Sequence, residues 1–141
     1  MKRCGNCGSR ELAKKDQRNK TFPWRDFPAA PLLVNIEFLE CHNCHELTMS
    51  AADFLKLDEA LKESVTRVVR SMIEAIRSRE KCEQNEIATH LGLSPEYLSE
   101  LKSGRKPPSF SAFNFLKTLF LAHGSFQVSD PNYLKPLERT A

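Results

Sequence analysis

The spacing of apolar residues along this chain becomes helical at about Ser50. Beyond that point, apolar side chains lie three or four positions apart, as on one face of a helix. They are Phe54, Leu57, Leu61, Val65, Val68, Met72 and Ile76. Ser50 and Asp53 form a capping-box-like start, with Asp in place of the usual Glu or Gln. The pattern predicts one long amphipathic helix, or two helices with a break between Leu57 and Leu61.

Two shorter helices are predicted between Gln84 and Pro108. Gly92 tolerates the positive φ with which the first of them ends, and a sharp turn follows. Ser94 is a good N-cap for the second helix, and Pro95 suits its first position, where a missing N–H is harmless. Two short helices joined by a turn that contains Gly are typical of a DNA-binding helix-turn-helix. An ordinary pair of short helices in a small bundle is the alternative.

The segment before Ser50 has a different pattern. Val34, Ile36 and Phe38 alternate with their neighbours, which predicts a strand just before Cys41. The aromatic and turn-rich stretch from Thr21 to Pro28 is expected to be a loop.

These elements predict a mainly α protein, in which a small β-containing module precedes a helical domain. We expect the module over residues 1–49, a helical linker over 50–64, a helix-turn-helix domain over 65–124 and a tail over 125–141. An apolar helix from Ser109 to Leu121, ended by Gly124, should close the helical domain.

Four of the five cysteines occur in two C-x-x-C pairs, Cys4 with Cys7 and Cys41 with Cys44. Each pair can form a tight turn, here called a knuckle, whose two sulfurs point at one ion. Two knuckles make a closed four-sulfur site, which is typical of structural zinc and leaves no position for a catalytic water. Zinc would supply folding free energy to a module with little core of its own. Redox-active dithiols are the alternative.

Composition and charge narrow the class of protein. Of 141 residues, 40% are hydrophobic and 28% are charged, as in soluble globular proteins. The N-terminus has no apolar signal region, and no apolar run approaches the length of a membrane span, so we expect a cytoplasmic location. The net charge is only +3, and residues 82–141 carry six basic against six acidic residues. Affinity for DNA would therefore need a local basic cluster or dimerisation.

The run from Gln84 to Ser109 resembles the Xre/Cro-type helix-turn-helix of phage repressors and bacterial regulators. The shared pattern is an opening Gln, an Ala, a Leu-Gly, a Ser N-cap and a Gly-Lys/Arg-Pro exit. In this chain these are Gln84, Ala88, Leu91-Gly92, Ser94 and Gly104 to Pro107. The resemblance covers about residues 65–122 and implies a DNA-binding domain that acts as a homodimer on two half-sites.

In such a motif the second helix lies in the major groove and its N-terminal residues meet base edges. The basic residues after it are placed to reach phosphates, and the resemblance makes Gln84 a phosphate clamp. The candidate DNA-binding residues are Gln84, Ser94, Glu96, Tyr97, Ser99, Glu100, Lys102, Arg105 and Lys106. Two glutamates on a reading face are unusual, because Glu can accept from cytosine N4 but repels phosphate. They indicate an unusual operator, weak binding without a partner, or a face used for protein contacts.

The order of the two halves resembles the MqsA antitoxin family. In that family a zinc domain restrains a toxin, and a helix-turn-helix domain represses the operon as a dimer. The resemblance implies an autoregulating type II antitoxin that binds its own promoter and a cognate toxin. Phe22, Trp24 and Phe27 would either form a protein-binding face or cover the module's small core.

We expect a non-enzymatic, zinc-stabilised, dimeric transcriptional regulator. No Ser/His/Asp grouping, Gly-rich phosphate loop or carboxylate pair stands out at a meaningful spacing. The alternatives are a protein–protein adaptor and a zinc-containing regulator without a toxin partner.

Overall fold

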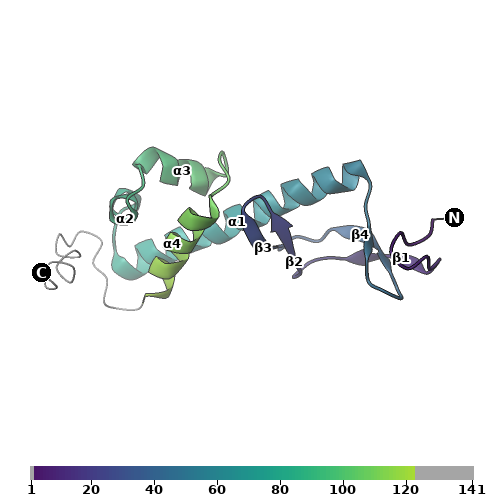
Figure 1. Cartoon of the computed structure of the whole chain (residues 1–141). Helices are drawn as coiled ribbons and strands as arrows, with labels where there is room; N and C mark the ends of the chain where they lie inside the picture. Colours follow the sequence, from purple (N-terminus) through teal and green to yellow (C-terminus); the bar gives the residue numbers. More distant parts are fainter. Residues whose placement is uncertain (1, 123–141) are drawn as a thin grey trace, which may run out of the picture. The chain divides into compact units, whose positions relative to one another are not determined.

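The computed structural model describes residues 2–122 (Figure 1). Contacts within the chain separate it into two compact units, Met1–Val65 and Thr66–Ala141. The helix α1 (Ala51–Glu80) contributes its first half to one unit and its second half to the other. It is a single helix of 30 residues, so the internal break that the sequence allowed does not occur. The segment expected to be a linker, residues 50–64, lies in the first unit.

The start of α1 is capped as predicted. The Ser50 N–H donates to Asp53 Oδ2 at 2.9 Å, and the Asp53 N–H donates to Ser50 Oγ at 3.1 Å. This reciprocal pair satisfies two donors that a helix N-terminus otherwise leaves open. The hydrogen bond from the Ser50 N–H also lowers the pKa of the Asp53 carboxyl, because it favours the charged form.

The first unit contains two small antiparallel sheets. The strands β1 (Leu12–Asp16), β4 (Glu37–Cys41) and β5 (Leu47–Thr48) form one sheet in the order β1-β4-β5. The strands β2 (Thr21–Trp24) and β3 (Phe27–Pro31) form a hairpin. Both pairings can be followed in Figure 1, where β1 runs beside β4 and β2 beside β3. The strand predicted before Cys41 is confirmed as β4, although it begins at Glu37.

The predicted loop from Thr21 to Pro28 is wrong, because this stretch forms most of the hairpin. Its prolines suggested a loop, but a two-stranded hairpin has only edge strands, and edge strands tolerate Pro. A two-residue turn joins the strands, and Arg25 in it has a positive φ of 52°. The Arg25 guanidinium carbon lies 5.2 Å from the centre of the Trp24 ring, which is a cation–π distance.

The hairpin aromatics are part of the core of the first unit. Trp24 and Phe27 are 5% and 3% exposed, and their ring centroids lie 5.6 Å apart. The Trp24 Nε1–H donates to Asp58 Oδ1 of α1 at 2.8 Å. The Leu33 N–H donates to Ser64 Oγ at 2.9 Å. The first half of α1 is therefore hydrogen-bonded to the β region, and Trp24 and Phe27 cover the core instead of forming an exposed face.

The second unit is helical. It contains the second half of α1, α2 (Gln84–Leu91), α3 (Pro95–Ser103) and α4 (Phe110–Leu121). Its fully buried apolar side chains include Val69, Ile73, Ile76, Ile87, Ala88 and Leu98. Arg79 of α1 donates to the Phe120 carbonyl at 2.6 Å and to the Leu119 carbonyl at 3.0 Å. This contact caps the end of α4 with a positive charge, which the helix dipole favours.

The prediction of a mainly α fold is wrong, because residues 2–122 contain five strands as well as four helices. The missed strands gave no alternating apolar signal: β1 is LAKKD, and the hairpin strands are rich in Pro. None of the helices in the described residues is long and apolar enough to span a membrane. The predicted helix end at Gly124 and the tail over 125–141 lie outside the described residues.

Candidate metal centre and nucleic-acid interface

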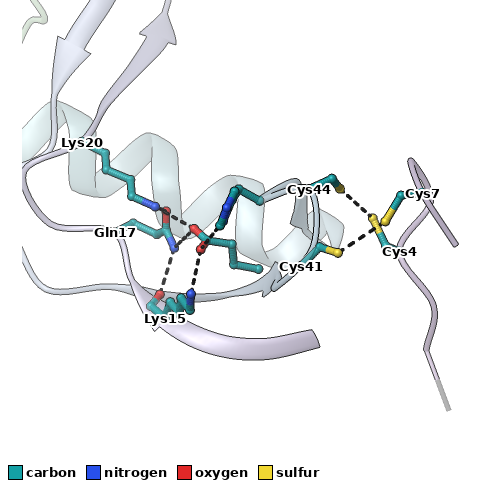
Figure 2. Close-up of polar contacts among 9 residues, drawn as sticks. Cys4, Cys7, Lys15, Gln17, Lys20, Cys41 and Cys44 are labelled. Carbon is teal, nitrogen blue, oxygen red and sulfur yellow. Dashed lines mark hydrogen bonds and ion pairs between the residues drawn. The ribbon is translucent and has the colours of Figure 1, made fainter. Parts of the chain in front are cut away.

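The four cysteines of the two knuckles form one cluster. Their Sγ atoms all lie within 4.8 Å of one another. The shortest separations join the two knuckles, at 3.5 Å for Cys4 with Cys44 and 3.5 Å for Cys7 with Cys41. An ion bound tetrahedrally at about 2.3 Å from each sulfur would place the sulfurs about 3.8 Å apart. The cluster, shown in Figure 2, therefore has the size of a four-coordinate metal site.

The two knuckles have the same backbone hydrogen bonds. The Gly8 N–H donates to the Cys4 carbonyl and the His45 N–H to the Cys41 carbonyl, both at 2.9 Å. The two first cysteines also donate alike, to the carbonyls of the residues five positions later. Gly8 and His45 both have a positive φ, of 75° and 64°. These bonds fix each turn, so the cysteine sulfurs are held in place by the backbone.

Exposure differs among the four thiols. Cys4 and Cys41 are buried, at 3% and 0% exposure, whereas Cys7 is exposed. The Asn43 side-chain amide lies 3.6 Å from Cys7 Sγ, and it lowers the pKa of that thiol by stabilising the thiolate. An amide that donates to a ligand sulfur is the kind of outer partner that tunes a metal site. No pattern in the sequence predicted this role of Asn43.

A buried carboxylate lies beside the cluster, at the last position before Cys41. Glu40 is 4% exposed, and its carboxylate contacts Lys20 Nζ at 2.7 Å and Lys15 Nζ at 3.3 Å. Gln17, fully buried, accepts from Lys20 Nζ at 2.9 Å. These contacts are drawn in Figure 2 with Lys15, Gln17 and Lys20 labelled. The network joins β1, β4 and the loop before β2, next to the second knuckle.

This network was not predicted from the sequence, although a signal for it exists. Glu40 lies two positions after the buried Phe38 in the same strand, so both side chains point to the same face. A charged residue at an inward position needs a partner. His45, five positions later, lies 3.7 Å from the Glu40 carboxylate, but Lys15, Gln17 and Lys20 come from 20 or more positions earlier, which no local pattern shows.

The pKa of the Glu40 carboxyl is lowered to about 2 from an ordinary 4.5, and the hydrogen bond from Lys20 is the largest cause. The folded state therefore binds fewer protons than the unfolded state between these two values. We expect the stabilisation from Glu40 to be complete above pH 4.5 and to disappear as the pH falls to about 2. Protons also displace a metal from cysteine ligands in this acidic window, so the test is made at neutral pH with zinc present. Urea unfolding followed by Trp24 fluorescence should show a less stable first unit in Glu40→Gln than in the wild type, because Lys20 loses its ion-pair partner. Equal stabilities would contradict the role of Glu40.

The helix-turn-helix predicted over Gln84 to Pro108 is present at the level of its two helices. Gly92 ends α2 with a φ of 71°, and Ser94 Oγ caps α3 by accepting from the Tyr97 N–H at 3.1 Å. Leu98 and Leu101 of α3 are buried, as expected for its inward face. Both helices were predicted from local signals. Each signal, such as a cap or a glycine, lies within a few positions of the helix end that it marks.

The candidate DNA-binding residues differ in their surroundings. Exposed ones are Ser94, Glu96, Ser99, Arg105 and Lys106, whereas Gln84, Tyr97, Glu100 and Lys102 are half-buried. The first turn of α3 thus offers Glu96, and Tyr97 beside it, to a partner. Arg105 donates to Ser103 Oγ from its backbone N–H at 3.4 Å and from its side-chain Nε at 3.3 Å.

Two of the three basic residues that were predicted to contact phosphates, Lys102 and Lys106, are already ion-paired within the chain. Lys106 Nζ lies 2.9 Å from Glu100 Oε2, and the Lys106 N–H also donates to the Glu100 carbonyl at 3.4 Å. Lys102 Nζ pairs with Glu74 Oε1 of α1. The structure therefore brings Glu100 and Lys106 together at the end of α3. It pairs Lys102 with Glu74 of α1.

No protein-family model matches this chain, and no curated protein matches it.

Proposed function

We propose that this chain is a sequence-specific, DNA-binding transcriptional regulator that uses α3 as its reading helix. The observation that carries the proposal is the capped α2–turn–α3 unit. Its inward side chains, Leu98 and Leu101, are buried, and Glu96, Ser99 and Arg105 are exposed. A short helix held rigidly from behind with an open first turn suits insertion into a major groove.

We further propose that the four-cysteine cluster binds structural zinc. Four thiolates at tetrahedral spacing favour zinc among the common divalent metals. Cys4, Cys7, Cys41 and Cys44 would be the ligands, and they leave no ligand position for water. The metal's role would be to join the two knuckles and so stabilise the first unit, because binding free energy at a site that exists only in the folded chain is folding free energy.

The regulator is proposed to be a homodimeric, autoregulating type II antitoxin of the cytoplasm. The support is the order of the two halves, a four-cysteine module before an Xre-type motif, which resembles the MqsA family. The cognate toxin would bind the first unit. There Phe54 and Leu55 of α1 are 60% and 72% exposed, and exposed apolar groups of this size are common in protein interfaces.

The proposal is tested by the binding of the zinc-loaded protein to the duplex upstream of its own gene. Fluorescence anisotropy should show preference for this duplex over a shuffled one, with affinity falling steeply as salt rises. Arg105→Ala should weaken binding to both duplexes by a similar factor, because a phosphate contact carries no sequence information. Tyr97→Ala should change which bases are preferred at one or two positions. If Tyr97→Ala merely scales all affinities, Tyr97 does not read bases.

A protein–protein adaptor is the second candidate function. The observation in its favour is the pair of glutamates on the outer side of α3, of which Glu96 is exposed and forms no ion pair with another residue of the described range 2–122. Weak binding to both duplexes, with little preference, would favour the adaptor. Contacts between proteins release few counterions, so the dependence on salt separates the two candidates.

A further inference from the structure

Lys102, in the final turn of α3, contacts α1 through both its backbone carbonyl and its side-chain ammonium group. The Lys102 carbonyl accepts from Arg70 Nε at 3.3 Å and from Arg70 Nη2 at 3.2 Å. Its ammonium group pairs with the Glu74 carboxylate one turn further along α1. Arg70 and Glu74 are four positions apart, so both lie on the same face of α1.

The exposure of these groups is consistent with a contact made inside the second unit. The Lys102 side chain is 27% exposed, compared with 62% for Lys106. Glu74 is held from a second side by Arg77 Nη1 at 3.5 Å. Lys102 is the first cause of a lowered pKa at the Glu74 carboxyl, so this carboxylate is charged at neutral pH. The lysine that the sequence assigned to a DNA phosphate thus has a partner in the free protein.

We propose that Lys102 is a positioning residue, which together with Glu74 and Arg70 sets the orientation of α3 for reading DNA. The inference rests on the proposed DNA-binding function and changes the role of one residue within it. In this arrangement Arg105, and not Lys102, supplies the phosphate contact after the reading helix. Glu74 then has a positive role in binding, although it is an acidic residue on a protein that binds a polyanion.

The two possible roles of Lys102 predict opposite changes in DNA affinity when the charge of Glu74 is removed. If Lys102 binds a phosphate, Glu74→Gln removes a competitor and a repulsive charge, so binding should strengthen on every duplex. If Lys102 positions α3, Glu74→Gln should weaken binding to the upstream duplex by up to about fivefold, as expected for loss of an exposed ion pair. Binding to a shuffled duplex should stay equal or rise, because that binding depends on net charge.

The experiment measures both duplexes across a salt series for the wild type, Glu74→Gln, Lys102→Met and the double variant. Lys117→Met, an exposed lysine of α4, is the matched control for loss of one positive charge. Positioning predicts that the two single variants lose preference for the upstream duplex alike and that the double variant loses no more than either. The slope of log affinity against log salt should be the same for Lys102→Met and Lys117→Met. A slope that falls by about 0.9 for Lys102→Met alone would overturn the inference, because that is the loss of one phosphate contact.

A measurement without DNA keeps the inference separate from the proposed function. In the free protein, amide hydrogen exchange over Leu98 to Ser103 should become faster in Glu74→Gln and Lys102→Met than in Lys117→Met. Unchanged exchange would overturn the positioning role even if DNA binding is found. Faster exchange in these two variants, together with a wild type that binds neither duplex, would support the contact to α1 and overturn the proposed function.

Discussion

Replacing Cys41 by Ser, or removing the metal with a chelator, is expected to unfold the first unit and leave the second one folded. A four-cysteine zinc site supplies about 10–16 kcal/mol of binding free energy, which in a small module is folding free energy. The first unit has an apolar core, formed by the hairpin aromatics, by Leu32 and Phe38 and by one face of α1, but its two sheets are small, and we expect this core not to stay folded without the metal. We expect the first half of α1 to lose its hydrogen bonds with Leu33 and Trp24 at the same time.

The chain offers a clean readout and a matched control for this prediction. Trp24 is the single tryptophan and lies in the core of the first unit, so its fluorescence reports on that unit alone. Hydrogen exchange at Ile87 and Leu98 reports on the second. Cys82→Ser changes the fifth cysteine, which is outside the cluster, and should leave both signals unchanged. Elemental analysis should find one zinc per chain in the wild type. Loss of both signals together in Cys41→Ser would contradict two separately stable units.

The Gly104→Ala substitution is expected to destabilise the second unit by about 2–5 kcal/mol, more than Gly92→Ala does. Both glycines end a helix with a positive φ, of 80° and 71°, so each substitution has the left-handed cost of about 1–2 kcal/mol. At Gly92 a Cβ would meet no atom within 4 Å, whereas at Gly104 it would lie 3.2 Å from Thr66 Cγ2 of α1. Crowding of a buried contact adds about 1–3 kcal/mol.

Urea unfolding followed by far-UV circular dichroism, with zinc present, measures these differences. Gly92→Ala is the control for backbone strain alone. Thr66→Ser removes the Cγ2 atom, so the double variant Thr66→Ser, Gly104→Ala should recover the crowding part and retain the backbone part. Equal losses for Gly92→Ala and Gly104→Ala would show that α1 and the end of α3 can separate at no cost.

The sequence could predict the helices of the second unit because their signals are local. Ser94 caps α3 through a bond to a residue three positions later, and Gly92 ends α2 in place. The fold of the first unit was harder to predict. The hairpin is rich in Pro, and β1 is mostly polar, so neither shows the alternation from which strands are recognised.

The candidate sites likewise have some features that the sequence predicts and others that it does not. The spacing of the cysteines predicted that they cluster. Each C-x-x-C pair forms a local turn, and two such turns can point four sulfurs at one ion. The same spacing could not show that Glu40 lies buried beside the cluster with Lys20. Lys102 and Lys106 looked alike in the sequence, and only the structure separates them by partner: Glu74 of α1 for one, Glu100 for the other.

The sequence by itself thus determined the ends of the short helices, the capped start of α1 and the four cysteines of the candidate metal site. Backbone geometry and ligand chemistry act over a few residues, so the order of residue types is enough to specify them. The tertiary structure alone decided that α1 is shared by both units, that Trp24 is core, and that Glu40 and Lys102 have ion-pair partners. These features depend on groups 20 to 34 positions apart, and only the folded chain brings such groups within reach of one another.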